Sequence, residues 1–446
     1  MFAVMMTAEW MAWIAELSQP LHRRLAGKLV NVVAGVLFAS GRRTASSWWR
    51  AAGVGTNFRS YYYFLDALGR KVSEVAAVLL QIVMRRIDPG DRLVFAIDDS
   101  PTKRYGPKVQ GAGIHHNPTP GPAGAKFLYG HNWVVISRIV RHPCFGIIGL
   151  PLLGLLYVKL KDIRKLPGST GVVFRTKLEQ AVELIVWLRT VIGKKTVFWL
   201  AVDGFYAKRE VLDQARGEGV VIVSRLRKDA AVFDLPSVLK PGQKRGRGRP
   251  PIYGKNRLCL AKRAGQRRGW TTIEVRTCTG KIAIKKIKTF LATWRPAGGV
   301  IRVVLVEEDD GSWRALFCTD CEASVVDIVQ TALDRWGIEQ NFHDLKETEG
   351  IAQVQLRRYF ANIGALNLNL WVHTLIEVWA WGRGASKLCD RSDRPWDVAD
   401  RRPSHADRRK ALQREMLEKE YQAIGVPEPW SEKIRRLLAG IANLAG

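Results

Sequence analysis

The sequence predicts a mixed α/β protein in which a helical domain precedes a core built around a sheet. Up to about residue 88, apolar residues recur at three- and four-residue spacing, which is typical of amphipathic helices. From residue 90 onward, short continuous apolar runs appear, and this pattern is typical of strands buried on both faces. Because helical patterns alternate with these runs, we expect helices packed against a central sheet.

The chain carries a large excess of positive charge. Its 446 residues include 70 Lys and Arg against 41 Asp and Glu, which gives a net charge of +29. Lys and Arg displace the counterions condensed on nucleic-acid phosphates, so this excess favours a polyanionic partner. The basic residues are spread along the whole chain rather than gathered on one amphipathic helix, which favours nucleic acid over a membrane surface.

Neither a targeting segment nor a membrane span is expected. The first 17 residues lack a basic region and carry Glu9 and Glu16 within their apolar part, unlike a signal peptide. The longest apolar run, residues 145–158, is interrupted by Pro151 and is shorter than the roughly 20 residues that a span needs. The six cysteines are scattered, which is typical of reduced thiols. We therefore expect a cytoplasmic protein without membrane contact.

Residues 41–64 have the character of a small helical DNA-binding unit. A basic turn and a short helix end at Gly53, and an aromatic helix follows. Arg42, Arg43 and Arg50 cluster in this stretch, so we predict that they contact DNA. The alternative is that the aromatic helices of this stretch simply belong to the core.

Two predicted buried strands end in aspartate. The apolar run 93–97 is followed by Asp98 and Asp99, and the run 196–202 is followed by Asp203. Carboxylates at the ends of neighbouring strands converge at one edge of a sheet, where open α/β sheets bind their ligands. Taken singly, each aspartate could be an ordinary turn residue at the end of a strand.

A third acidic residue lies on a predicted helix much later in the chain. At helical spacing, the stretch 335–346 places Arg335, Glu339, Phe342 and Lys346 along one face. By itself this face could be an exposed, ion-paired surface. Together with the two aspartates, however, Glu339 could hold Mg²⁺, which prefers oxygen ligands. Two such ions about 4 Å apart could activate a water molecule and stabilise the leaving oxygen of a phosphodiester.

In this order, the three acidic motifs resemble those of the Asp-Asp-Glu (DDE) transposases of bacterial insertion sequences. The similar subgroup has a tyrosine–arginine–glutamate–lysine signature and a β-rich insertion. The resemblance covers roughly residues 40–380. It implies a ribonuclease-H-like mixed-sheet core with a β-rich insertion, preceded by a helical N-terminal domain and followed by a helical C-terminal tail. The motifs that carry it are AIDDS at 96–100, AVDGFY at 201–206, and RWGIE at 335–339 with Phe342, Leu345 and Lys346.

The resemblance also implies a division into five segments. The insertion would be the stretch in which a basic loop and short β-like runs interrupt the alternation of strands and helices. The segments are residues 1–88 (helical N-terminal domain, DNA binding), 89–227 (first part of the core), 228–300 (basic β-rich insertion), 301–381 (remainder of the core, with the glutamate helix) and 382–446 (basic surface linker to about 412, then a helical segment).

Carried over by position, the family's catalytic carboxylates would be Asp98, Asp203 and Glu339. They would hold two Mg²⁺ ions, for which Mn²⁺ is expected to substitute. Asp99 competes with Asp98 for the first ligand position. We favour Asp98, because an Asp-x-Ser pattern then ends at Ser100.

Basic residues near these carboxylates would contact the DNA. Arg335 suits bidentate contact with a phosphate at the cleaved end, whereas Lys346 would act as a point charge. The family's tyrosine, three residues before the arginine, falls on Ala332, so its contact must be absent or supplied elsewhere. In the insertion, Arg247 and Arg249 belong to an RGRP sequence that resembles an AT-hook core. These arginines would enter a narrow minor groove, or else contact phosphates without sequence preference.

The resemblance implies a transposase that cuts DNA at the ends of an insertion sequence and joins the freed 3′-OH ends to target DNA. Its partners would be double-stranded DNA, as terminal repeats and as target, and a second copy of the chain. The expected working form is thus a homodimer on DNA, associated with the nucleoid. Two alternatives stay open: a stand-alone metal-dependent nuclease of the same fold, and a non-catalytic DNA-binding derivative of a transposase.

Overall fold

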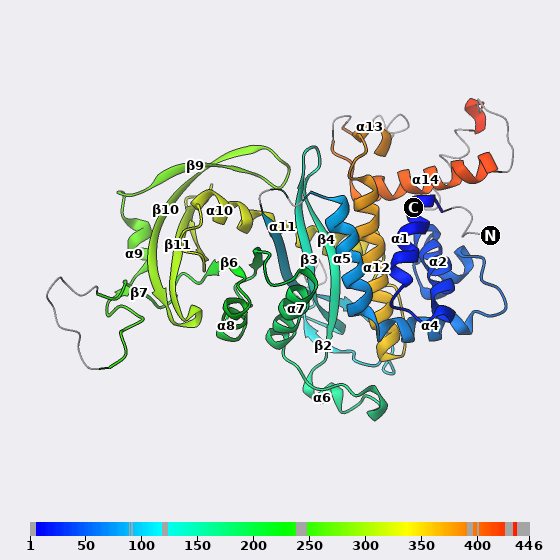
Figure 1. The fold of residues 1–446 in the computed structure, drawn as a ribbon, viewed down its shortest axis with the longest axis horizontal. Helices are drawn as coiled ribbons and strands as arrows, with labels where there is room; N and C mark the ends of the chain where they lie inside the picture. Colours follow the sequence, from blue (N-terminus) through cyan, green and yellow to red (C-terminus); the bar gives the residue numbers. More distant parts are fainter. Residues whose placement is uncertain are drawn as a thin grey trace.

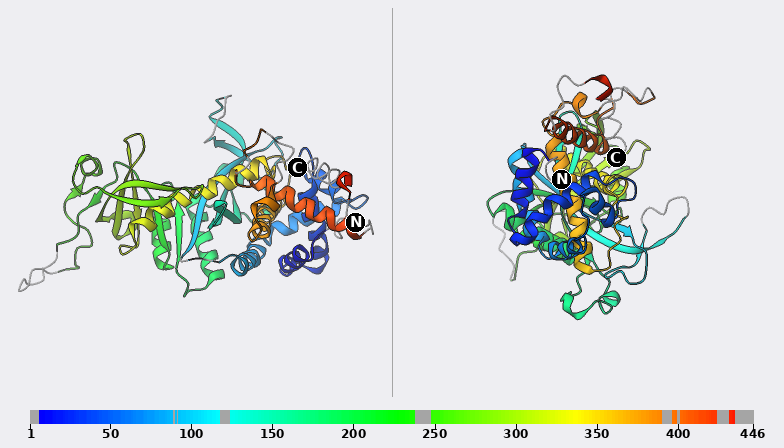
Figure 2. Two further views of the ribbon diagram at one scale, coloured as in Figure 1. Left: turned by 90° about the horizontal axis from the view of Figure 1, so that it is seen from above. Right: turned by 90° about the vertical axis from the view of Figure 1, so that its right-hand side faces the viewer.

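The computed structural model describes residues 6–88, 90, 92–117, 124–237, 248–389, 396–398, 401–423 and 431–434. In this part of the chain, one large mixed sheet extends from a β-rich end of the molecule to a helical end (Figure 1). Figure 2 shows from two further sides that both described ends of the chain lie at the helical end. The prediction of a mixed α/β fold is confirmed. No helix in these ranges is sufficiently long and apolar to cross a bilayer.

The N-terminal domain is a group of helices with an aromatic core. Thr7 and Thr44 start two of the helices, because their side chains accept backbone hydrogen bonds from Trp10 and Ser47. Trp10 and Trp48 are fully buried, so aromatic residues of this domain form its core, as the alternative interpretation of the sequence held. The helices are α1 (Ala8–Ser18), α2 (Arg23–Phe38), α3 (Ala45–Ala51), α4 (Arg59–Gly69) and α5 (Val72–Arg86).

The domain is docked on the long buried helix α12 (Tyr359–Ala380), in which every residue except Phe360 is buried. Two glycines allow the close approach of α4. A Cβ on Gly364 would lie 2.2 Å from the carbonyl oxygen of Leu65, and one on Gly69 would lie 1.9 Å from that of Phe360. Any larger side chain would therefore separate the two helices.

Five strands form the centre of the sheet, in the order β4-β3-β1-β5-β6. The middle strand β1 pairs in parallel with β5, and β5 pairs in parallel with β6, whereas β3 runs antiparallel to both β1 and β4. The short strand β2 pairs with β3. These strands are β1 (Leu93–Lys103), β2 (Gly113–His116), β3 (Phe127–His142), β4 (Gly146–Tyr157), β5 (Phe198–Val202) and β6 (Val221–Leu226).

The sheet continues beyond β6 into the predicted insertion. Strand β12 pairs antiparallel with β6, and β11, β10, β7 and β8 follow, while β9 pairs with β10. The stretch expected to be rich in strands, residues 228–300, is therefore built on the same sheet as the core. Its elements are β7 (Val232–Phe233), β8 (Arg257–Leu258), α9 (Leu260–Gly265), β9 (Thr271–Arg276) and β10 (Ile282–Trp294). The added strands continue beyond the predicted boundary, because β11 (Gly299–Glu307) and β12 (Trp313–Cys318) lie almost wholly in the segment predicted as the remainder of the core.

Further helices cover the sheet and connect its strands. Helix α11 packs on β1, β3 and β4, and α7 packs on β3 and β4 as well as on α8. The remaining elements are α6 (Leu160–Ile163), the 3₁₀ turns Gly168–Thr170 and Arg295–Ala297, α7 (Lys177–Ile192), α8 (Arg209–Gly217), α10 (Val325–Asp334), α11 (Trp336–Glu347), α13 (Ala385–Leu388) and α14 (His405–Ala423).

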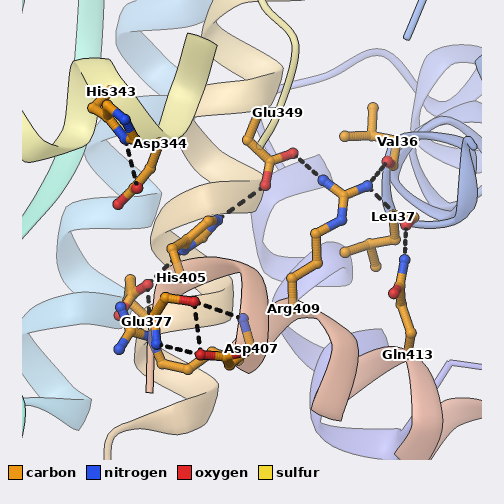
Figure 3. A network of polar contacts seen from close by, with 12 residues as sticks. Val36, Leu37, His343, Asp344, Glu349, Glu377, His405, Asp407, Arg409 and Gln413 are labelled. Carbon is orange, nitrogen blue, oxygen red and sulfur yellow. Dashed lines mark hydrogen bonds and ion pairs between the residues drawn. The ribbon is translucent and has the colours of Figure 1, made fainter. Parts of the chain in front are cut away.

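Helix α14 joins the N-terminal domain to the core through buried charge (Figure 3). The guanidinium group of Arg409 is paired with the carboxylate of Glu349, and it also donates to the carbonyl oxygens of Val36 (2.6 Å) and Leu37 (2.8 Å) at the end of α2. Gln413, one turn further along α14, donates to the same carbonyl of Leu37. Arg409 and its neighbours are thus packed inside the protein, not in the surface linker that the sequence analysis expected there.

The imidazole of His405 lies between two buried carboxylates. Its Nδ1 is 2.6 Å from Glu377, its Nε2 is 3.0 Å from Glu349, and Arg408 lies 2.9 Å from the other oxygen of Glu377. Burial alone would lower the pKa of His405, but the two carboxylates outweigh it and raise the pKa to about 9. Burial likewise opposes ionisation of Glu377, but Arg408 and His405 lower its pKa to about 2. Helix α14 is therefore held in place by ion pairs that are buried away from water.

Substitution Glu349→Gln should destabilise the protein strongly, because it leaves the buried charge of Arg409 without its counter-ion. We expect the free energy of unfolding, measured by denaturant titration, to fall by about 3–5 kcal/mol. The matched control is Glu183→Gln, which removes an exposed ion pair with Arg175. The control should cost less than about 1 kcal/mol. Equal losses in the two variants would contradict the role assigned to the buried pair.

The protonated imidazole of His405 should make stability depend on pH. Its pKa is about 9 in the folded protein, compared with 6.5 for the unperturbed group, so its contribution is complete below about pH 6.5 and is lost as the pH rises through about 9. We expect the difference in thermal midpoint between wild type and His405→Gln to be large at pH 6 and to shrink steadily towards pH 10. A difference independent of pH would show that His405 is not charged in the fold.

Candidate functional site

Asp98 and Asp203 lie side by side at the edge where the parallel pairing of β1 with β5 ends. The register ends with the pair Ile97 and Val202, and the two aspartates are the next residues along the chain. The expectation that Asp98 closes its strand is wrong, because β1 continues to Lys103 and stays paired with β3 over this length. Every residue of β5 is buried, which fixes this strand in the centre of the sheet. Burial, together with the nearby carboxylate of Asp203, opposes ionisation of Asp98 and raises its pKa to about 6 even though Arg335 acts in the other direction.

Glu339 is brought to this edge by helix α11 and by one arginine. Arg335, which precedes the first turn of the helix, donates from Nη1 to Oδ2 of Asp98 at 2.9 Å and from Nη2 to Oε1 of Glu339 at 2.5 Å. The helix can approach the sheet because Gly337 faces it, where an added Cβ would already lie 3.3 Å from Ile147. The predicted helical face is therefore observed with Arg335, Glu339 and a largely buried Phe342.

Asp99 makes contacts different from those of Asp98. Successive side chains of a strand point to opposite faces of the sheet. The hydroxyl of Tyr206 donates to Oδ1 of Asp99 at 2.9 Å, and the ammonium of Lys177 donates to Oδ2 at 2.6 Å. Both carboxylate oxygens are thus held by protein donors. Burial and the Asp99 carboxylate raise the pKa of Tyr206, so its hydroxyl stays protonated and donates.

Tyr206 and Lys177 were not predicted as site residues from the sequence. Tyr206 follows Asp203 by three residues, in a turn in which the amide of Tyr206 donates to the carbonyl oxygen of Asp203 at 2.9 Å. Its position within the second acidic motif could therefore have indicated that Tyr206 belongs to the site. Lys177 is the first residue of α7, a helix that begins with a capping box between Thr176 and Glu179. Its sequence neighbours gave no indication that it would contact Asp99.

The three predicted carboxylates offer the hard oxygen ligands that Mg²⁺ prefers, but an arginine side chain now separates two of them. Within the described residues, the cluster whose ligand atoms all lie within 4.8 Å of one another consists of His373, Glu377 and His405 instead. In that cluster, Glu377 and His405 already form the buried ion pairs around α14. At the edge where the β1–β5 pairing ends, the carboxylate of Asp98 lies near that of Asp203, and Arg335 bonds to both Asp98 and Glu339.

The predicted DNA-contacting arginines of the helical domain differ in their exposure. Arg42 and Arg50 are exposed to solvent. Arg43 is only 7% exposed, and its backbone amide donates to Gln353, so the expectation of an exposed DNA contact is wrong for its side chain. Burial, with the nearby cation of Arg409, lowers the pKa of Arg43 to about 10. Arg43 therefore belongs to the interior between α2 and the core.

The remaining predicted contacts are scattered. Lys346 is partly buried near the end of α11, and burial lowers its pKa. Arg249 is exposed at the β-rich end of the molecule, whereas Arg247 lies outside the described residues. Ala332, at the position of the family's tyrosine, lines a cavity of about 60 Å³ together with Arg225 and Arg335. The structure thus brings Arg335 to the carboxylates and places Arg249 in a different region of the fold.

Comparison with solved structures yields distant likenesses. A cryo-EM structure of a piggyBac transposase synaptic complex with hairpin DNA is 10% identical, with a TM-score of 0.40 over 99% of this chain and 84% of that chain. The crystal structure of the NurA nuclease from Sulfolobus solfataricus is 11% identical, with a TM-score of 0.25 over 63% of this chain and 86% of that chain. Both TM-scores are below 0.5, so neither likeness establishes a shared fold. No curated protein matches the chain.

A family comparison is more informative. The family described as DDE superfamily endonuclease matches residues 16–128 and 159–295, which together make up more than half of the chain. The matched ranges contain Asp98 and Asp203, and Glu339 lies beyond them. Endonucleases of this superfamily generally use divalent metals such as Mg²⁺. With its two aspartates adjacent at the edge of a mixed sheet, this chain belongs to the DDE superfamily endonuclease family.

Proposed function

We propose that the protein is a transposase that cleaves DNA at the ends of an insertion sequence and joins the resulting 3′-OH ends to target DNA. The observation that carries the proposal is the single site formed by three distant parts of the chain. Asp98 and Asp203 are the residues that follow the last parallel pair of β1 and β5, and Arg335 bonds to both Asp98 and Glu339. One site of this kind suits two successive phosphoryl transfers.

The central sheet supports a ribonuclease-H-like core. Strand order β4-β3-β1-β5-β6, with only β3 reversed among these five, is the order that such a core would have. The strands β7 to β12 then interrupt it before α11, as a β-rich insertion would. On this proposal the insertion extends to β12 instead of ending at residue 300, and it is joined to the core through the pairing of β12 with β6.

Asp98, Asp203 and Glu339 are proposed to hold two Mg²⁺ ions, with Asp99 reserved for contacts with Tyr206 and Lys177. When bound, the metal would activate the attacking oxygen and stabilise the leaving oxygen of the phosphodiester. Asp98 must lose its proton to act as a ligand, which its proximity to Arg335 favours. Arg335, once released from the carboxylates, presents a planar fork of donors suited to a phosphate of the cleaved strand.

The net charge of +29 supports DNA as the partner, because the acidic residues are too few to neutralise the basic ones. We propose that two copies of the chain act together on two element ends, in the cytoplasm and in contact with the nucleoid. Arg42, Arg50 and Lys346 are the proposed contacts in the helical domain and core, and Arg249 is proposed to contact DNA from the β-rich end.

Cleavage and joining can be tested with the purified full chain, DNA carrying the element's terminal repeats, Mg²⁺ and a target plasmid. We expect cleaved ends and joined products from wild type. Glu339→Ala should lower cleavage by more than about 100-fold, because a metal ligand is lost, while DNA affinity changes little. The matched control is Glu347→Ala, an exposed carboxylate on the last turn of the same helix, which should retain activity.

The products separate the transposase from the alternatives. DNA that is cut but never joined would identify a stand-alone nuclease. Binding without cleavage under any divalent metal would identify a non-catalytic derivative. Full cleavage by Glu339→Ala would show that this residue is not the third ligand.

Separate substitutions of Asp98 and Asp99 distinguish which of the two is the first metal ligand. Asp98→Asn should lower cleavage by more than about 100-fold, because the amide is a poor ligand for a hard cation. Asp99→Asn should mainly lower the thermal midpoint, because it weakens the contacts with Lys177 and Tyr206. The reverse result, with Asp99→Asn inactive and Asp98→Asn active, would reassign the first ligand.

A further inference from the structure

A concave surface lies between helix α4 and the segment that leads from α11 to α12. Its cavity of about 340 Å³, here termed the Tyr63 groove, is lined by Arg59, Tyr62, Tyr63, Leu356, Arg357 and Arg358. A second cavity, of about 400 Å³, is lined by Arg42, Lys103, Tyr105 and Gln353. The two are neighbours, since the amide of Tyr105 donates to the side chain of Gln355 (3.1 Å), a residue that also lines the Tyr63 groove.

The charge of this surface is positive and is not neutralised by the protein. Its basic side chains are all exposed, and no Asp or Glu lines either cavity. In the described part of the chain, none of them takes part in an ion pair, whereas Arg70 at the end of α4 is paired with Asp66. The five cations are Arg42, Arg59, Lys103, Arg357 and Arg358. Such a surface is complementary to the phosphates of a nucleic acid.

The surface also carries exposed aromatic rings. Tyr63 on α4 is 59% exposed and Tyr105, which follows β1, is 63% exposed, whereas the tryptophans of α1 and α3 are buried in the core. The guanidinium group of Arg358 lies 5.0 Å from the ring centroid of Tyr63. A DNA duplex presents phosphates and groove edges, and its base faces are hidden. Aromatic rings beside arginines in a cavity therefore suit the exposed base of an unpaired nucleotide.

The surface is close to the proposed catalytic carboxylates along the chain. Lys103 lies on β1, the strand that carries Asp98, and is five residues further on, a separation of about 16 Å. Residues 352–358 lie in the segment after α11, the helix that carries Glu339, and begin five residues beyond its last residue. At roughly 3.4 Å per nucleotide in a stacked strand, the separation corresponds to about five nucleotides. One DNA strand can thus reach both the carboxylates and the surface.

We propose that the Tyr63 groove binds an unpaired segment of DNA next to the cleaved end. A base would stack on Tyr63, while Arg59 and Arg357 contact the adjacent phosphates. The position of the segment relative to the cut rests on the proposed function, but the recognition of unpaired bases by the groove does not. Duplex DNA would bind elsewhere on the basic surface and would not depend on Tyr63.

The test compares two DNA substrates with the full-length protein in EDTA, so that no cleavage occurs. One is a fully paired duplex, and the other is the same duplex with a five-nucleotide unpaired end that contains 2-aminopurine. Wild type should bind the second substrate more tightly and quench its 2-aminopurine fluorescence by stacking. Tyr63→Leu should weaken binding of this substrate about tenfold and abolish the quenching, with unchanged affinity for the duplex. Tyr63→Phe should behave as wild type.

Two further variants act as controls. Trp396→Leu removes another exposed aromatic ring, 80% exposed and outside the groove, and should leave both affinities unchanged. Arg357→Gln should weaken binding of the unpaired substrate and reduce the dependence of its affinity on salt, because one phosphate contact is lost. Because Arg357 is exposed, this variant still tests the groove if Tyr63→Leu lowers the thermal midpoint.

The proposal is overturned if wild type binds both substrates equally, or if Tyr63→Leu and Arg357→Gln bind the unpaired substrate as tightly as wild type does. These results are independent of the joining assay. If the groove behaves as expected and no cleavage or joining is found, the proposed transposase function fails while the groove stands. If joining is found and Tyr63→Leu binds the unpaired substrate as wild type does, the groove proposal fails while the transposase function stands.

Discussion

The parallel pairing of β1 with β5 is the constraint on which the candidate site depends. The two strands are hydrogen-bonded neighbours in the sheet but about a hundred residues apart in sequence. Their register ends at Ile97 and Val202. This register alone places Asp98 beside Asp203. A shift of one residue in either strand would turn one of these side chains towards the opposite face of the sheet. Because β5 is buried on both faces, such a shift would also mismatch the packing of its side chains on each face, so the hydrophobic core maintains the geometry of the site.

Arg335 supplies the electrostatic part of the same arrangement. Three carboxylates cannot approach one another in a partly buried site without a compensating cation, since like charges repel strongly where water is excluded. In this structure the guanidinium group of Arg335 compensates Asp98 and Glu339. A divalent metal would compensate the same charge at higher density, which would free Arg335 for a phosphate. The metal and Arg335 would compete for the same carboxylate oxygens. Metal binding would therefore come before Arg335 contacts a phosphate.

At the helical end, buried charge has a structural role. Arg409 and His405 of α14 reach Glu349, which follows α11, and Glu377 of α12. The C-terminal helix therefore connects the end of α2 with the helix that bears Glu339. The segment between α11 and α12 is fixed at one end by this network and contributes to the Tyr63 groove further along. The segment between α11 and α12 thus connects the site, the groove and α14.

By itself, the sequence determined the class of fold and predicted the residues of the candidate site. Continuous apolar runs followed by aspartate predicted the two central strands, although β1 extends past Asp98 to Lys103. Helical spacing predicted the face with Arg335 and Glu339, since both signals are local. It favoured Asp98 over Asp99 but gave no sign that Asp99 contacts Tyr206 and Lys177, because those contacts depend on which neighbours face each side of the sheet. It also placed Arg43 on the surface, although its side chain is buried. Such features arise from contacts between residues distant in sequence, and only the tertiary structure determines them.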